Sequence, residues 1–207
     1  MKIISLTVGS LQTNCYLVSD SDNNCIIIDP GDEADFISTT IIENKYNPLA
    51  ILLTHGHFDH CLATLELKIN FQIPIYLHQN DSFLYNNASN SADYWSKIST
   101  NPPKLPKIDK HPTNSETIKI GKLEILVIHT SGHTPGSCCF LIDHYLFTGD
   151  TLFSHNRVGA TNHSYSSKSD LQNSISKIKS LIAKSRKQIQ IYPGHEEFGF
   201  TTSPSLF

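Results

Sequence analysis

One stretch constrains this chain more than any other: residues 51–60, Ile-Leu-Leu-Thr-His-Gly-His-Phe-Asp-His. Its apolar start predicts a short buried strand that ends at the first histidine. Side chains two apart on an extended chain point the same way, so His55 and His57 would leave the strand together. Asp59 and His60 follow a turn later, where we expect a helix over residues 59–69. One catalytic tetrahedral metal ion takes three protein ligands, so four candidates at this spacing suggest two adjacent metal ions.

Further candidate ligands follow strands that we predict later in the chain. His133 comes after the strand expected at residues 123–130, Asp150 after that at 145–148, and His195 after that at 188–192. Each of them lies beside a glycine, which permits a sharp exit from a strand. One such residue alone could be structural. Together with residues 51–60, however, the three favour a single metal centre built from strand ends.

Composition excludes several classes of protein. The chain has 207 residues, of which 39% are hydrophobic and 17% charged, as is typical of a globular protein. Its net charge is −3 with scattered Lys and Arg, so we expect a small-molecule substrate and neither nucleic acid nor a membrane as partner. No signal peptide or membrane span is expected. Five cysteines, predicted to be buried free thiols, favour the cytoplasm. They are Cys15, Cys25, Cys61, Cys138 and Cys139.

The remaining pattern predicts short strands mixed with amphipathic helices, which suggests two packed sheets with helices outside. A polar turn at residues 20–24 and the pair Gly121-Lys122 are each typical of a hairpin. Strands are expected at residues 2–8, 13–19, 25–29, 49–54, 75–77, 117–120, 123–130, 137–142, 145–148 and 188–192, and further helices from the break at 29–32 to about Tyr46 and from an N-cap at Ser169 to about residue 185.

A long polar stretch, residues 78–116, separates the two halves of this pattern. Its first part is a candidate helix, and Tyr85, Tyr94 and Trp95 give it aromatic surface. Loops of this length without secondary structure are usually functional or disordered. A flap near the active site and a packed cover over a sheet edge are both compatible with the sequence.

The motifs together resemble the metallo-β-lactamase superfamily, and within it the small glyoxalase II-like hydrolases. The resemblance covers nearly the whole chain. It is carried by Gln-Thr-Asn-Cys-Tyr at 12–16, Asp-Pro-Gly at 29–31, His-x-His-x-Asp-His at 55–60, Ser-Gly-His-Thr-Pro-Gly-Ser at 131–137, Thr-Gly-Asp-Thr-Leu-Phe at 148–153 and Tyr-Pro-Gly-His at 192–195. It implies one α+β domain over residues 1–207, a four-layer αββα sandwich with the metal site at the edge between the two sheets.

The resemblance also implies a ligand set for two divalent metal ions, which could be Zn, Fe or Mn. Asp150 resembles the carboxylate that bridges both ions. A shared water of lowered pKa would then yield the hydroxide that attacks the carbonyl carbon of a small thioester of the hydroxyacylglutathione type, with Asp59 as the catalytic residue that orients it. The other ligands implied are His55, His57 and His133 for the first ion, and Asp59, His60 and His195 for the second.

Other activities stay open at this stage. A single-iron persulfide dioxygenase resembles the chain at His55, His133 and Asp150, and hydrolysis of lactones, phosphoesters or β-lactams would use the same ligands. A non-catalytic metal-bearing scaffold is the third class. Small relatives commonly carry Gly-Arg-x-Asp after the bridging Asp, where residues 159–162 here read Gly-Ala-Thr-Asn. Arg157, His155 and His163 are therefore further candidates for lining the substrate pocket.

Overall fold

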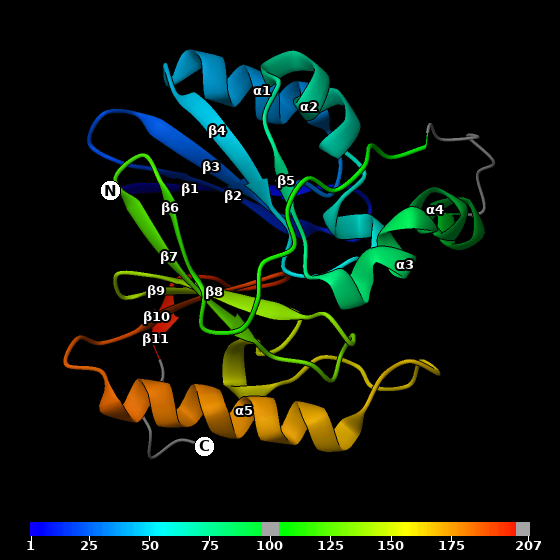
Figure 1. The fold of residues 1–207 in the computed structure, drawn as a ribbon, viewed down its shortest axis with the longest axis vertical. Helices are drawn as coiled ribbons and strands as arrows, with labels where there is room; N and C mark the ends of the chain where they lie inside the picture. Colours follow the sequence, from blue (N-terminus) through cyan, green and yellow to red (C-terminus); the bar gives the residue numbers. More distant parts are fainter. Residues whose placement is uncertain (97–103, 202–207) are drawn as a thin grey trace.

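Two mixed β-sheets face each other, and helices cover their outer faces (Figure 1). The computed structural model describes residues 1–96 and 104–201. Helices α1 (Ala34–Glu43) and α2 (Thr64–Phe71) lie over the first sheet, and α5 (Lys168–Lys184) lies over the second. The order helix, sheet, sheet, helix is the αββα sandwich that the sequence predicts.

The first sheet has five strands in the order β1-β2-β3-β4-β5. The first three pair antiparallel, whereas β4 pairs parallel with both of its neighbours. Because parallel neighbours need a crossover, α1 connects β3 to β4 and α2 leads to β5. The strands are β1 (Lys2–Val8), β2 (Thr13–Ser19), β3 (Asn24–Ile28), β4 (Asn47–Leu52) and β5 (Ile75–Tyr76).

The second sheet has six strands in the order β11-β10-β9-β8-β7-β6. Two hairpins, β6–β7 and β8–β9, form most of it, as predicted. Strand β10 then adds parallel to β9 after the crossover through α5. The strands are β6 (Thr117–Ile120), β7 (Leu123–His129), β8 (Cys138–Ile142), β9 (Tyr145–Gly149), β10 (Gln190–Pro193) and β11 (Phe200–Thr201), the last of which we did not predict.

Three apolar cores hold the four layers together. Alternation along the strands sorts side chains between them: Ile51 packs toward α1 and α2, whereas Leu52 faces the second sheet. Cys138 and Cys139 likewise enter different cores, which confirms that they point to opposite faces of one strand. All five cysteines are buried free thiols, also as predicted.

Three predicted helix starts are wrong. The helix expected at residues 59–69 is a 3₁₀ turn, Phe58–His60, and α2 begins only at Thr64. The backbone amides that follow this turn instead donate to the carbonyls of Pro30 and Gly31, so a loop of the first sheet fixes the chain here. The helix expected from residue 32 begins at Ala34, because Glu33 has a left-handed backbone (φ 55°). The N-cap of α5 is Ser167, whose Oγ accepts from the amide of Asp170, and not Ser169.

The polar stretch 78–116 divides into two parts, with residues 97–103 outside the described chain. A 3₁₀ turn (Gln79–Asp81) leads into α3 (Ser82–Asn86) and α4 (Ala88–Ser96). Tyr94 and Trp95 are exposed, but Tyr85 is buried and adds no surface. Later, Leu105 and Ile108 pack on the first core and the amides of Asp109 and Lys110 donate to Ile75 O of β5, so this second part covers a sheet edge. In the described residues, no helix is long and apolar enough to cross a membrane.

Candidate metal centre

The end of β4 is fixed between the two sheets. Thr54 donates from its backbone N and its Oγ1 to the carboxylate of Asp29, at 2.7 and 2.6 Å, within the first sheet. Its carbonyl accepts from the amide of Cys138 at 2.8 Å, in the second sheet. His55 therefore emerges at the junction of the sheets, and its side chain is buried.

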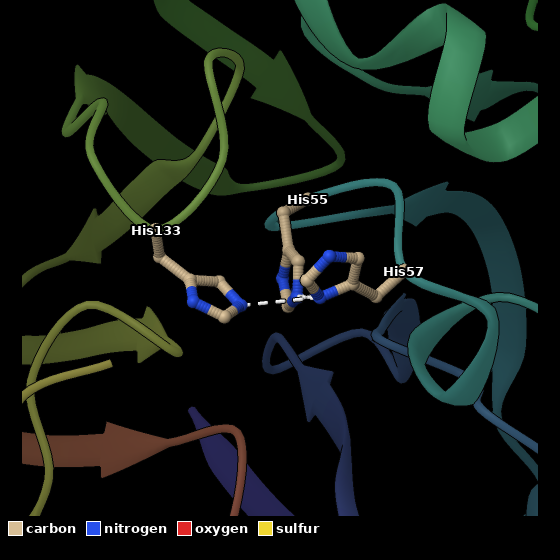
Figure 2. A group of neighbouring side chains, drawn as sticks. All are labelled: His55, His57 and His133. Carbon is tan, nitrogen blue, oxygen red and sulfur yellow. Dashed lines mark hydrogen bonds between the residues drawn. The ribbon is translucent and has the colours of Figure 1, made fainter. Parts of the chain in front are cut away.

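Three imidazoles converge at this junction (Figure 2). His57 Nδ1 lies 3.1 Å from His55 Nε2 and 3.1 Å from His133 Nε2. Figure 2 shows His55 and His57 on the loop after β4, and His133 on the loop between β7 and β8. One ring nitrogen from each of the three residues lies within 4.8 Å of the other two, so the group is close enough to hold a metal ion.

The outward nitrogens of these imidazoles show which tautomers they adopt. His133 Nδ1 lies 2.8 Å from the carbonyl of Ala160, which can only accept, so Nδ1 carries the proton. His55 Nδ1 lies 3.0 Å from Thr54 Oγ1, whose own proton already goes to Asp29. Both Nε2 atoms therefore present lone pairs to the centre. Burial lowers the pKa of His57 to about 3, assisted by the neighbouring His133, and burial lowers that of His55 as well, so these rings are neutral.

A second cluster adjoins the first. His195 Nε2 lies 3.3 Å from His60 Nε2 and 3.3 Å from Asp59 Oδ2, and His60 Nε2 lies 3.5 Å from the same oxygen. The outward nitrogens are again held: His60 Nδ1 lies 3.0 Å from Asp29 Oδ2, and His195 Nδ1 lies 3.1 Å from the carbonyl of Leu11. Such partners orient histidine ligands in metal sites.

Asp150 lies between the clusters. Its Oδ1 is 3.4 Å from His60 Nε2 and 3.7 Å from His195 Nε2, whereas its Oδ2 is 3.6 Å from His133 Nε2. Among the described residues, Oδ1 is buried without a hydrogen-bond partner. Gly194 allows this crowding, since a Cβ there would lie 2.3 Å from Asp150 Oδ1.

The carboxylates and imidazole lone pairs at this centre favour the binding of cations. Burial alone would lower the pKa of His60, but the carboxylates of Asp59, Asp150 and Asp29 raise it to about 10. Burial raises the pKa of Asp59, yet His60 and His195 together bring it below its usual range. Converging lone pairs and an unpaired buried carboxylate oxygen are unfavourable unless positive charge lies among them. The residues present thus fit divalent metal ions.

Two carboxylates that support the centre were not identified in the sequence analysis. Asp29 holds both Thr54 and His60; the sequence analysis placed it at the end of a strand and in the Asp-Pro-Gly motif but gave it no role at the centre. Asp81 is fully buried, and it accepts from Gly56 N (2.9 Å), Thr134 Oγ1 (2.6 Å) and Gly136 N (2.6 Å). It therefore ties the loop of His55 and His57 to the loop of His133, and nothing in the local sequence marks it.

Tyr165 is a third missed residue, with its hydroxyl 2.9 Å from His57 Nε2. Three candidates for lining the substrate pocket were named in the sequence analysis. One of them, His163, stacks on the Tyr165 ring with centroids 5.1 Å apart and lines a pocket at the centre. Of the other two, Arg157 forms an ion pair with Glu196 instead, and His155 is exposed. Cys61 donates from Sγ to the His57 carbonyl at 3.2 Å.

Sequence comparison gives the family. The sequence model of the Metallo-beta-lactamase superfamily matches residues 8–195. This chain belongs to the metallo-β-lactamase superfamily. The superfamily is one of metal-dependent hydrolases, and the His/Asp clusters described above fit its divalent metal chemistry. The predicted fold is thereby confirmed.

Similar proteins include the hydroxyacylglutathione hydrolase GloC of Haemophilus influenzae, which is 32% identical over 96% of this chain and 92% of its own length. Among solved structures, BLEG-1 B3 metallo-β-lactamase superposes with a TM-score of 0.85 at 31% identity, covering 99% of this chain and 95% of that one. TTHA1623 in a di-iron-bound form superposes with a TM-score of 0.83 at 32% identity, covering 98% of this chain and 96% of that one.

Proposed function

We propose that this metallo-β-lactamase superfamily member is a binuclear metal-dependent hydrolase of small thioesters. The observation that carries the proposal is the pair of adjoining ligand clusters with Asp150 between them. In this proposal Asp150, which lies between the clusters, would help to hold two divalent ions, which could be Zn, Fe or Mn. The first ion would be held by His55, His57 and His133, and the second by Asp59, His60 and His195.

Two divalent ions, when bound, would lower the pKa of water at the centre and polarise the substrate carbonyl. The residues of this chain position the reactants. Asp59 lines the pocket beside the centre, and its Oδ2 lies 3.3 Å from Thr13 Oγ1, which can donate to it. That contact orients the Asp59 carboxylate, which would accept a proton from the attacking water. No serine or cysteine nucleophile is required.

The thioester substrate is supported by the relative GloC, which is named as a hydroxyacylglutathione hydrolase and matches almost from end to end. The completeness of the second cluster supports two ions rather than one. The two clusters by themselves would also serve hydrolysis of lactones or phosphoesters, and single-iron oxidation of persulfides would use only the first. Metal content and substrate range together separate these activities.

The experiment measures metal content by elemental analysis and thiol release from small thioesters, S-lactoylglutathione included, on protein purified without added metal. We expect close to two ions per chain with turnover, and close to one ion with little turnover in His195→Ala. His144→Ala is the matched control, because His144 lies on the β8–β9 turn against Asp143 and Tyr145. One iron with oxygen uptake on a persulfide would contradict the proposal, and two ions without release from any thioester would contradict its thioester part.

A further inference from the structure

A pocket of about 540 Å³ opens directly on the proposed metal centre. His57, Asp59 and His133 form its inner end. Its outer walls come from α3 and α4 on one side and from the loop at residues 160–165 on the other. Its volume is in the range of small-molecule sites, and its position is that of a substrate pocket.

The walls of this pocket are mainly aromatic and apolar, with polar atoms from Asn87, Ser91, Asn162 and His163. Phe83 and Tyr165 make an edge-to-face contact across it, with ring centroids 5.7 Å apart. Trp95 and Leu11 also line it, and the side chains of Phe83, Trp95 and Leu11 are 50%, 62% and 51% exposed. Large apolar side chains left this open around one pocket indicate a binding surface for an apolar group.

Charge complementarity points the same way. No Lys or Arg belongs to the lining of the pocket in the described part of the chain. Arg157, the nearest candidate from the sequence, is engaged by Glu196. Carboxylates are normally recognised by Arg or Lys, and desolvating one without a partner is unfavourable. The described walls thus offer no Lys or Arg to a thiol such as glutathione, which carries two carboxylates.

We infer that this pocket binds the thiol portion of the substrate, and that this thiol is uncharged and bears an aromatic or similarly flat apolar group. The inference rests on the proposed thioesterase function. The acyl group of a small thioester has few heavy atoms and fills little of a pocket of this size, so most of the volume is left for the thiol. Phe83, Trp95 and Tyr165 would contact it through their ring faces and edges.

Trp95 provides a direct measurement of binding, because it is the one tryptophan of the chain. Metal-free protein is titrated with two thioethers that cannot be hydrolysed, benzyl methyl sulfide and S-methylglutathione, while Trp95 fluorescence is followed. We expect a saturable change with a Kd at least tenfold lower for benzyl methyl sulfide. Equal binding of the two, or tighter binding of S-methylglutathione, would overturn the inference.

Turnover is then compared between two lactoyl thioesters that differ only in the thiol, benzyl mercaptan against glutathione, with each rate divided by that of hydroxide-catalysed hydrolysis. We expect kcat/KM at least tenfold higher for the benzyl thioester. Phe83→Ala should lower that value about tenfold and change that of the glutathione thioester less than twofold. Phe36→Ala is the matched control, because Phe36 is also 50% exposed but lies on α1, outside the pocket.

A charge-gain variant tests the same inference in the opposite direction. Asn162 lines the pocket and is exposed, so Asn162→Arg adds the missing cation, and we expect it to raise kcat/KM for the glutathione thioester severalfold. Loss of both activities in Phe83→Ala alike would overturn the inference. If protein with two metal ions hydrolyses neither thioester while Trp95 still reports the selective binding, the proposed function fails and the pocket assignment stands.

Discussion

Replacing Asp81 should destabilise the protein through the loops that carry the proposed ligands. Its carboxylate is fully buried and accepts two backbone amides, from Gly56 and Gly136, and one hydroxyl, from Thr134. In Asp81→Ala both amides lose their acceptor inside the protein. A buried donor left without a partner costs about 1–3 kcal/mol, so we expect the free energy of unfolding to fall by about 4 kcal/mol.

The free energy of unfolding of Asp81→Asn should lie between those of the wild type and Asp81→Ala, for a geometric reason. One of its two positions would hold an NH₂ group, which must face either the Gly56 amide or the Gly136 amide, and neither can accept. Thr134 can adapt, because its hydroxyl also lies 2.6 Å from Ser137 Oγ and can rotate. One lost acceptor predicts a decrease of about 2 kcal/mol.

Urea unfolding of the metal-free protein, followed by circular dichroism, measures both differences. Asp35→Asn is the control, since Asp35 is an exposed carboxylate in the first turn of α1, and its removal should change stability by less than about 1 kcal/mol. A decrease below 1 kcal/mol for Asp81→Ala would refute the reasoning, because it would mean that water replaces the carboxylate at both amides.

Further predictions follow from single contacts. Tyr165→Phe removes the hydroxyl beside His57 Nε2 and should weaken binding of the first ion about tenfold in competition with a chelating dye, with little change in stability. Gly132→Ala should cost more than about 3 kcal/mol in urea unfolding, because its φ is 139° and a Cβ would lie 2.3 Å from the Leu171 amide nitrogen. Burial raises the pKa of Asp20, but hydrogen bonds from backbone and side-chain amides lower it to about 2. Since this folded pKa is below the unfolded value of about 3.9, Asp20 stabilises the protein above pH 4 and loses this effect as the pH falls toward 2. The difference in unfolding free energy from Asp20→Asn should therefore shrink between pH 5 and pH 2.5.

The sequence predicted the layers and the positions of the proposed ligands for a definite reason. Each ligand type stood at the end of an apolar run beside a turn residue, and strand ends that share an edge of a sandwich meet in space. The supporting residues had no such local signal. Asp81 reaches Gly136 across 55 positions, and Tyr165 reaches His57 across 108. Partners so distant in sequence depend on the fold itself.

The wrong helix starts have the same origin. Residues 59–63 were predicted to be helical, but Asp59 and His60 lie in the second cluster, and the amides after them bond to the loop at residues 30–31. A regular helix would withdraw these amides into its own ladder. The site therefore overrides local propensity at the point where the chain leaves the first sheet. Glu33, with its left-handed backbone, marks a second such point, two residues after the same loop.

The centre is also where the two sheets are joined by backbone hydrogen bonds. The Thr54 carbonyl of the first sheet accepts from the Cys138 amide of the second sheet. The Asn14 amide of the first sheet donates to the Gly194 carbonyl, which follows a strand of the second sheet, at 2.7 Å. Both hydrogen bonds lie beside the ligands. Much of the remaining interface between the sheets is apolar, and at the β2–β3 and β6–β7 turns the Lys122 amide also donates to the side chain of Asp20. Hydrogen bonds fix direction as well as distance, whereas apolar contacts permit sliding. The ligand clusters thus stand beside backbone hydrogen bonds that join the two sheets, and these bonds help to preorganise the ligands.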